Sequence, residues 1–289
     1  MRHHVDGHLV DAEAATLPVD DRGVTFGDAV GEPVRVDGGT PVAWRAHVDR
    51  LLDACDALGF DPGVGDAELR ERVDDTLAAN GLDDALARLS ITRGRTQSSR
   101  GPFGRLRPPA DPEPTVVVTV EPLSVDRSAV TLQTVRSQPI RPAAVPAAPV
   151  THNRLDAVRA QAELRQAAPP DDDPADEALL LDDSGHVVGG TASDPIMVAN
   201  DALRLPALAE WPARTATRTV VRELAEAEDL PVVDGAYTPA DLRAADEVFL
   251  AEPTAGVRPV AKIDGVDVGG GPVTQLLAHL FDEGVVAAD

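Results

Sequence analysis

The sequence predicts a mixed α+β fold, and three observations lead to this prediction. Apolar residues recur at spacings of three and four over residues 44–58, as on one face of a helix. They alternate with polar residues over residues 85–92, as in a half-buried strand, and a Gly-rich turn follows the short strand 34–36. Because helices, strands and hairpins are interleaved along the chain, α+β is favoured over a doubly wound parallel sheet.

The N-terminal part combines short strands with two helices. Val48, Leu51 and Cys55 give the first helix an apolar face, and Gly59 ends it. In order, we expect a strand over residues 4–10 with a turn or bulge at Asp6-Gly7, a turn over 20–23, a strand over 34–36, helices over 44–58 and 67–80, and strands over 85–92 and 115–120.

Two irregular segments are expected in the middle of the chain. Residues 93–114 are rich in Arg, Gly, Ser and Pro and indicate a long loop, whereas residues 139–149 are mostly Pro, Ala and Val and indicate an extended connector. The elements expected beyond it are a helix over 153–166, a hairpin of 177–181 and 187–188, a strand over 195–199, helices over 219–227 and 239–245, a strand over 247–251 and a last helix over 275–281.

The composition limits the kind of protein. A length of 289 residues suffices for about two domains. A net charge of −23 argues against binding to nucleic acid or to an anionic membrane surface. The single cysteine, Cys55, excludes a disulfide framework and a cysteine-based metal site, and no metal site is predicted. No apolar run approaches the ~20 residues that span a bilayer, and no signal peptide is visible, so we expect a cytoplasmic protein.

Lysine is almost missing from the chain. Lys262 is the single lysine, and all other fixed positive charge is arginine. A surface rich in Asp and Glu and poor in Lys is typical of a protein from a high-salt cytoplasm, where salt screens the repulsion between carboxylates. The alternative is an ordinary acidic protein.

A series of short motifs follows in a fixed order over nearly the whole chain. They are Asp21-Arg22-Gly23, Phe26-Gly27-Asp28, Glu32 with Val34-Arg35-Val36, His47-Val48-Asp49-Arg50-Leu51, Thr92-Arg93-Gly94, residues 176–182, Gly190-Thr191-Ala192-Ser193-Asp194, Thr217-Arg218, residues 245–250, and Pro259-Val260 before Ile263-Asp264-Gly265. In this order they resemble the class IV aminotransferases, the fold-type IV pyridoxal-phosphate enzymes. That family includes branched-chain aminotransferase, D-amino-acid aminotransferase and aminodeoxychorismate lyase.

The resemblance implies a two-domain fold of the D-amino-acid aminotransferase type. It places a small N-terminal α/β domain over residues 1–124 and a larger C-terminal domain over residues 125–289, with pyridoxal 5′-phosphate in the cleft between them and a dimer as the usual unit. Short loops and the stretch Thr151-His152-Asn153 favour the lyase-like side of the family.

The resemblance also identifies candidate cofactor-binding residues. It gives Arg50 the role of a positive charge on the cofactor's phosphate, although a solvated helix arginine is the alternative. Amide donors at a helix N-terminus favour an anion, and the matching turn contains Ala216 and Thr217. A third contact is Thr254. This phosphate site is altered, because Thr215 replaces the family's glycine and Pro253 precedes Thr254.

Two residues that the family's chemistry requires are missing. The position of the Schiff-base lysine holds Val150, and the position of the glutamate that pairs with the pyridine nitrogen holds Gly189. Gly31 likewise replaces an aromatic residue. His152 lies near the lysine position, but an imidazole forms no stable aldimine. Lys262 lies before an expected turn, where a solvated charge is the ordinary interpretation.

The segment from Arg93 to Arg107 is the one basic stretch in an acidic chain. Arg93, which matches a family motif, is the candidate for binding an anionic substrate. The alternative, which carries equal weight, is a mobile loop without a binding role.

Two functional hypotheses follow. The first is a catalytically degenerate homologue that binds pyridoxal phosphate non-covalently, binds another small anion, or acts as a partner subunit beside an active homologue. The second is a working aminotransferase or 4-amino-4-deoxychorismate lyase that uses an atypical amine. The residues at positions 150 and 189 favour the first.

Overall fold

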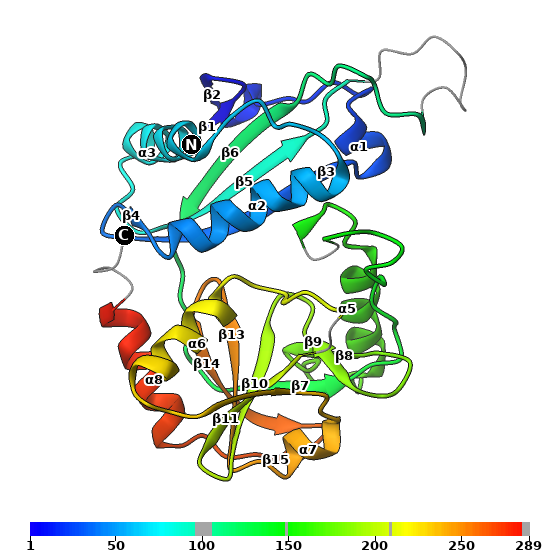
Figure 1. The fold of residues 1–289 in the computed structure, drawn as a ribbon, viewed down its shortest axis with the longest axis vertical. Coiled ribbons are helices and arrows are strands. Elements are labelled where there is room, and N and C mark those ends of the chain that lie inside the picture. Colours follow the sequence, from blue (N-terminus) through cyan, green and yellow to red (C-terminus); the bar gives the residue numbers. More distant parts are fainter. Residues whose placement is uncertain (96–105, 148–149, 208–209, 285–289) are drawn as a thin grey trace. The chain divides into compact units, whose positions relative to one another are not determined.

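The computed structural model describes residues 1–95, 106–147, 150–207 and 210–284. The chain folds into two compact units. The N-terminal unit comprises Met1–Ser124 and Pro146–Asn153, and the C-terminal unit comprises Val125–Val145 and Arg154–Asp289. Each unit combines a sheet with helices, so the predicted α+β class is confirmed (Figure 1). The expected division into domains at residue 124 stays a prediction.

The N-terminal unit contains a six-stranded antiparallel sheet in the order β2-β1-β6-β5-β3-β4. Helix α2 packs on β3, while α3, which is equally long, packs on β1 and β6. The elements are β1 (Arg2–Val5), β2 (His8–Asp11), α1 (Arg22–Phe26), β3 (Ala29–Asp37), β4 (Thr40–Pro41), α2 (Trp44–Leu58), α3 (Asp66–Asn80), β5 (Ala85–Thr92) and β6 (Thr115–Pro122), with a 3-10 turn over Ala12–Ala14.

The core of this unit lies between the sheet and its two long helices. Leu51, Leu69 and Leu89 are fully buried there, because the apolar face of each helix meets the inward side chains of the strands. The expected strand over residues 4–10 is a hairpin that turns at Asp6-Gly7, where both residues have positive φ.

A short segment from the middle of the chain returns to this unit. Val150 is buried in its core, and Thr151 forms a bridge with Val30. The His152 amide donates to the Ala29 carbonyl at 2.9 Å, and Asn153 Nδ2 donates to the Gly27 carbonyl at 2.9 Å. These contacts fix residues 150–153 against the start of β3.

The C-terminal unit contains a nine-stranded sheet in the order β12-β11-β10-β13-β14-β7-β8-β9, with β15 paired to β14. Helices α6 and α8 lie side by side against β13 and β14 (Figure 1). The elements are β7 (Val130–Thr134), α5 (Leu155–Ala167), β8 (Glu177–Leu181), β9 (Val187–Gly189), β10 (Asp194–Ala199), β11 (Ala202–Pro206), α6 (Thr217–Ala227), β12 (Val232–Gly235), α7 (Pro239–Arg243), β13 (Glu247–Glu252), β14 (Gly256–Ile263), β15 (Val266–Asp267) and α8 (Pro272–Gly284).

Several expectations are corrected. Residues 22–26 form α1 rather than part of a turn, because the Asp21 carboxylate caps the helix by accepting from the Gly23 amide. The described part of the expected extended connector contains turns, with the Ala144 and Val145 amides bonded to the Arg141 carbonyl. Residues 96–105 of the expected loop lie outside the described residues.

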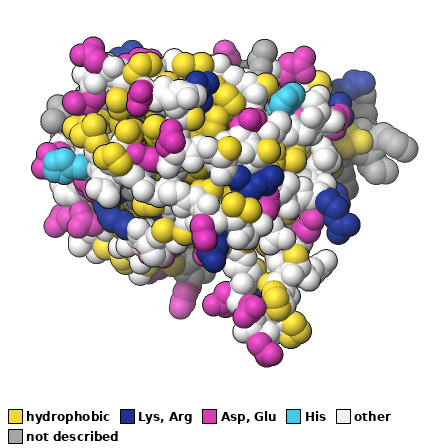
Figure 2. Space-filling model, turned by 90° about the horizontal axis from the view of Figure 1, so that it is seen from below, with side chains coloured by type: hydrophobic (Ala, Val, Ile, Leu, Met, Phe, Trp, Pro, Cys, Tyr) yellow, Lys and Arg dark blue, Asp and Glu magenta, His cyan; other side chains and the backbone are white. Residues whose placement is uncertain are grey.

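Acidic side chains are spread over the face seen in Figure 2 and are interspersed with Lys and Arg. No helix in the described ranges combines the length and the apolar character needed to cross a membrane.

Candidate functional site

Arg50 lies in α2 beside a buried carboxylate of the N-terminal unit. Its Nε is 3.5 Å from Glu32 Oε2, and His47 Nδ1 is 3.1 Å from the other oxygen of the same group. Glu32 is 3% exposed. The carboxylate therefore orients two side chains that lie one helical turn apart, and it compensates the positive charge of Arg50 within its own unit.

Val150, at the position that the resemblance assigns to the Schiff-base lysine, is a core residue. Its side chain is 4% exposed and belongs to the apolar core of the N-terminal unit. Two residues further on, the His152 imidazole lies beside Gly31, where a Cβ atom would come within 2.9 Å of His152 Nε2. The imidazole thus takes the space that a side chain at position 31 would need.

Burial lowers the pKa of His152, and the nearby Arg88 charge lowers it further. At a pH at which His152 of an unfolded chain would begin to take up a proton, the ring in the folded protein is therefore still neutral. Its contribution to the free energy of unfolding is complete above pH 6.5, the ordinary pKa of histidine, and declines as the pH falls below that value.

We therefore expect His152→Gln to lose less stability than the wild-type protein when the pH falls from 7.5 to 5.5. Urea unfolding of both proteins at the two pH values measures this difference. Equal losses in the two proteins would show that His152 does not contribute to acid sensitivity.

The start of α6 carries the candidate phosphate contacts of the C-terminal unit. The Asp194 carboxylate accepts hydrogen bonds from the Arg214 amide at 2.9 Å and from the Thr215 amide at 2.7 Å. For the next two amides, of Ala216 and Thr217, no acceptor is found within the described part of the chain. These two N–H groups lie at the positive end of the helix dipole, which suits an anion.

Thr254 lies in the turn between β13 and β14, close to this helix start. The Thr215 hydroxyl donates to Asp194 Oδ2 at 2.8 Å and lies 3.4 Å from the Ala251 carbonyl, so the helix start lies against the end of β13. The Thr254 hydroxyl is 3.4 Å from Glu252 Oε1, and burial raises the pKa of that carboxyl. The turn that holds Thr254 thus begins two residues after Ala251, the residue of β13 that Thr215 contacts.

Gly189 ends β9 with a φ of +144°, a conformation that side-chain-bearing residues rarely adopt. A Cβ atom there would lie 2.6 Å from Arg214 Cγ. Arg214 has a side chain that is 3% exposed, and its Nη1 is 3.8 Å from Asp156 Oδ2. A buried guanidinium therefore occupies the space beside the position that the resemblance assigns to a glutamate.

The turn that follows Gly189 is held by a second buried carboxylate. Glu177 accepts from the Thr191 amide at 2.9 Å, from the Thr191 hydroxyl at 2.6 Å and from the Ser193 hydroxyl at 2.9 Å. Sequence reasoning overlooked Glu177 and Arg214 as site residues. Glu177 belongs to a quoted motif and could have been noted, whereas no local pattern marks Arg214.

Arg93 is enclosed by acceptors of its own unit. Its Nε donates to both Asp28 oxygens, its two terminal nitrogens donate to the Leu58 and Gly59 carbonyls at the end of α2, and its guanidinium lies 4.7 Å from the centre of the Phe60 ring. This geometry favours a structural role, and the substrate role stays a prediction.

We expect Arg93→Gln to lower the free energy of unfolding by about 3 kcal/mol, because two carbonyls lose their donor and Asp28 keeps only Arg22 as its ion-pair partner. Arg95→Gln, which removes a 61% exposed partner of Asp20, is the matched control and should lower the free energy of unfolding much less. Urea unfolding measures both. Equal effects would contradict the structural role of Arg93.

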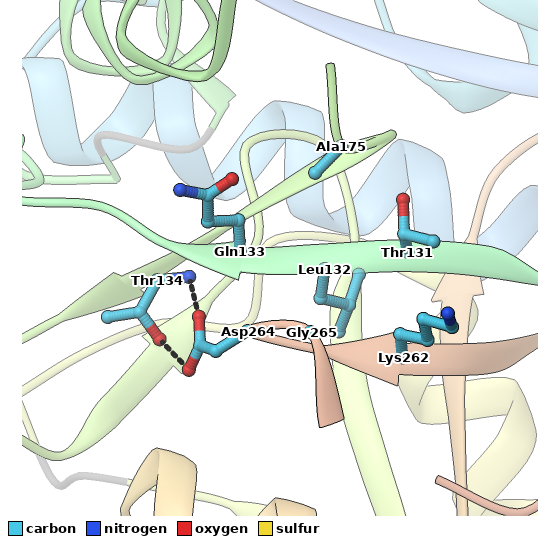
Figure 3. A pocket seen from close by; sticks show the side chains of 8 residues that line it. All are labelled: Thr131, Leu132, Gln133, Thr134, Ala175, Lys262, Asp264 and Gly265. Carbon is cyan, nitrogen blue, oxygen red and sulfur yellow. Dashed lines mark hydrogen bonds between the residues drawn. The ribbon is translucent and has the colours of Figure 1, made fainter. Parts of the chain in front are cut away.

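Lys262 lies near the far end of β14 from the turn of Thr254. Its Nζ is 3.6 Å from Asp267 Oδ1, and its side chain is 52% exposed. It borders a groove of about 380 Å³ that is lined by residues of the paired strands β7 and β14 and of the turn after β14, among them Thr131, Gln133 and Asp264 (Figure 3). Asp264 is engaged there by the Thr134 amide and hydroxyl at 2.6 and 3.0 Å.

The comparisons with known proteins agree with the motifs. The family model of amino-transferase class IV matches residues 29–263. A putative branched-chain-amino-acid aminotransferase of Methanocaldococcus jannaschii is 32% identical over 98% of this chain and 96% of its own length. A D-alanine aminotransferase of Listeria monocytogenes is 29% identical over 100% of this chain and 97% of its own.

Solved structures show the same fold. A branched-chain aminotransferase from Thermoproteus uzoniensis superimposes with a TM-score of 0.88 at 26% identity, covering 100% of this chain and 96% of that one. A 4-amino-4-deoxychorismate lyase from Pseudomonas aeruginosa superimposes with a TM-score of 0.81 at 30% identity, covering 97% and 98%. The resemblance and the fold type inferred from the motifs are thereby confirmed.

Proposed function

The chain belongs to the class IV aminotransferase family, and we propose that it is a catalytically degenerate member that keeps part of a phosphate-binding site. The observation that carries this proposal is Val150, a buried apolar side chain at the position of the Schiff-base lysine. An aldimine needs a primary amine, and valine can neither form one nor move a proton.

The single lysine does not replace the missing amine. Lys262 lies six residues beyond Gly256 on β14, which places it about 20 Å along the strand from the turn that holds Thr254. A phosphate bound at the start of α6, beside that turn, would leave the rest of a single-ring cofactor out of reach of Lys262. The residues present therefore do not fit the covalent chemistry of pyridoxal phosphate.

The residues do fit the binding of a small phosphorylated anion. The amides of Ala216 and Thr217 and the hydroxyl of Thr254 are the proposed contacts in the C-terminal unit. The phosphate role of Arg50 stays a prediction from the resemblance. Pyridoxal 5′-phosphate held non-covalently is the first candidate ligand, and another small anion is the second. The relatives' names support the alternative of a working aminotransferase or lyase that uses an atypical amine.

The assembly state and the cellular environment of the protein are proposals as well. A homodimer, or a subunit paired with an active homologue, is in keeping with the family. A salt-rich cytoplasm is in keeping with a net charge of −23 and a single lysine. Binding to nucleic acid is not expected of so acidic a chain.

A titration of the purified protein with pyridoxal phosphate in molar salt tests the proposal. After borohydride treatment, mass spectrometry should find no reduced adduct at Lys262, while the ligand should raise the melting temperature in a saturable way. A site-specific adduct, or turnover of any amino acid with a keto acid, would establish the alternative. If the protein shows no binding of the ligand and no turnover, the proposed phosphate site itself is overturned.

A further inference from the structure

The side chain of Arg214, which is distant in sequence, lies beside Gly189. Arg214 Cγ lies 2.6 Å and its Nε lies 3.2 Å from the point where a Cβ of residue 189 would be. The two side chains cannot both be present without a displacement. The buried guanidinium has therefore replaced whatever group residue 189 would otherwise present.

Three carboxylates act on the charge of Arg214, and each of them also accepts hydrogen bonds from other groups. Asp194 is occupied by the Arg214 and Thr215 amides, and Glu177 is occupied by the turn of Thr191 and Ser193. Asp156 faces Arg214 Nη1 at 3.8 Å but also accepts from the Ile140 amide at 3.0 Å.

A second cation adds to this environment. Arg154 donates to the Thr191 carbonyl, in the same turn, and its charge also acts on Arg214. A group that approaches Gly189 therefore meets a guanidinium that stays protonated at any ordinary pH.

Arg214 also belongs to the segment that forms the phosphate contacts. It precedes Thr217 by three residues, so their Cα atoms are at most about 11 Å apart. A small ring compound with its phosphate on the amides of Ala216 and Thr217 is long enough to reach the surroundings of Arg214.

We infer that Arg214 determines which phosphorylated ring compounds the C-terminal unit accepts: those that present a neutral or anionic group to Gly189, and not a cationic ring. This inference rests on the proposed function, because it needs the phosphate site at the start of α6. A carboxylate or an unprotonated ring nitrogen can accept a hydrogen bond from a guanidinium, whereas a positive ring nitrogen is repelled by it.

Two matched ligands isolate the charge. Pyridoxal phosphate has a ring nitrogen that can stay neutral, and its N-methylated derivative carries a permanent positive charge there. Inorganic phosphate reports the phosphate site alone. Each of the three is titrated by calorimetry in molar salt, which screens exposed charges much more than buried ones.

Wild-type protein should bind pyridoxal phosphate at least about tenfold more tightly than the N-methylated compound. In Arg214→Gln this ratio should fall to within about twofold, while the affinity for inorganic phosphate is retained. The double variant R214M/D156N removes both members of the buried ion pair, so it gives the same readout without an uncompensated carboxylate if the single variant does not fold.

The possible results separate the two claims. Equal binding of the two ring compounds by the wild-type protein, or an unchanged ratio in both variants, would overturn the role of Arg214 and leave the phosphate site standing. No binding of any of the three ligands would overturn the proposed function, and the role of Arg214 with it.

Discussion

Gly189→Ala should lower the free energy of unfolding by about 3 kcal/mol, an unusually large cost for one added methyl group. Part of this cost is backbone strain, because Gly189 has a φ of +144°. The rest is steric, because the new Cβ would lie 2.6 Å from Arg214 Cγ, in the middle of a side chain that has no solvent to move into.

Gly185→Ala is the matched control. Gly185 also has a positive φ, +84°, and belongs to the same unit, but apart from its chain neighbours no atom of the described residues lies within 4 Å of the position its Cβ would take. It should show the strain alone and cost about 1–2 kcal/mol. Urea unfolding in molar salt measures both variants.

The steric part can be measured separately with Gly189→Ala/Arg214→Ala. If Arg214 fills the space beside residue 189, the double variant should be more stable than the sum of the two single effects predicts, by about 1 kcal/mol or more. Additive effects, or equal costs of Gly189→Ala and Gly185→Ala, would refute the close packing of these two residues.

The sequence predicts local features of this fold well. The helix over residues 44–58 has the predicted bounds, because an apolar face and a following glycine, which adopts a φ of +74°, are both visible in the residues. Strand β14 escaped prediction, because its burial does not alternate and Pro259 and Lys262 interrupt its apolar residues. Its place is set by pairing with β7 and β13, which are distant in sequence.

In the candidate site, too, local features could be predicted from the sequence and contacts between distant segments could not. The motifs assign Val150 and Gly189 to the positions of the lysine and the glutamate, and this assignment stays a prediction from the sequence. What fills the space left by a loss could not be inferred. Arg214 lies beside Gly189, and His152 lies beside Gly31, only in the tertiary structure. No local sequence pattern predicts these two contacts. The space beside each of these two glycines is therefore filled by a side chain that is distant in sequence.

Glu177→Ala should have the largest effect of any single substitution proposed for the C-terminal unit, a loss of about 4 kcal/mol of unfolding free energy. Its buried carboxylate accepts from the Thr191 amide and hydroxyl, from the Ser193 hydroxyl and, at 3.2 Å, from the Ala192 amide. Truncation leaves these donors buried without an acceptor, and each charge-assisted bond contributes about 1.5–3 kcal/mol before relaxation. Glu177→Gln keeps one acceptor oxygen and should lose about half as much.

Glu163 offers a control in the same unit with a similar set of donors. Its carboxylate accepts from the Arg136 and Ser137 amides at 2.8 and 2.9 Å, but its side chain is 23% exposed, so water can replace the lost bonds. Glu163→Ala should cost about 1–2 kcal/mol. Because Glu177 holds the turn that begins at Gly189, Glu177→Gln should also weaken the discrimination between neutral and cationic ring ligands, which Glu163→Ala should leave intact. Equal destabilisation by Glu177→Ala and Glu163→Ala would show that burial does not increase the contribution of the Glu177 hydrogen bonds to the free energy of unfolding.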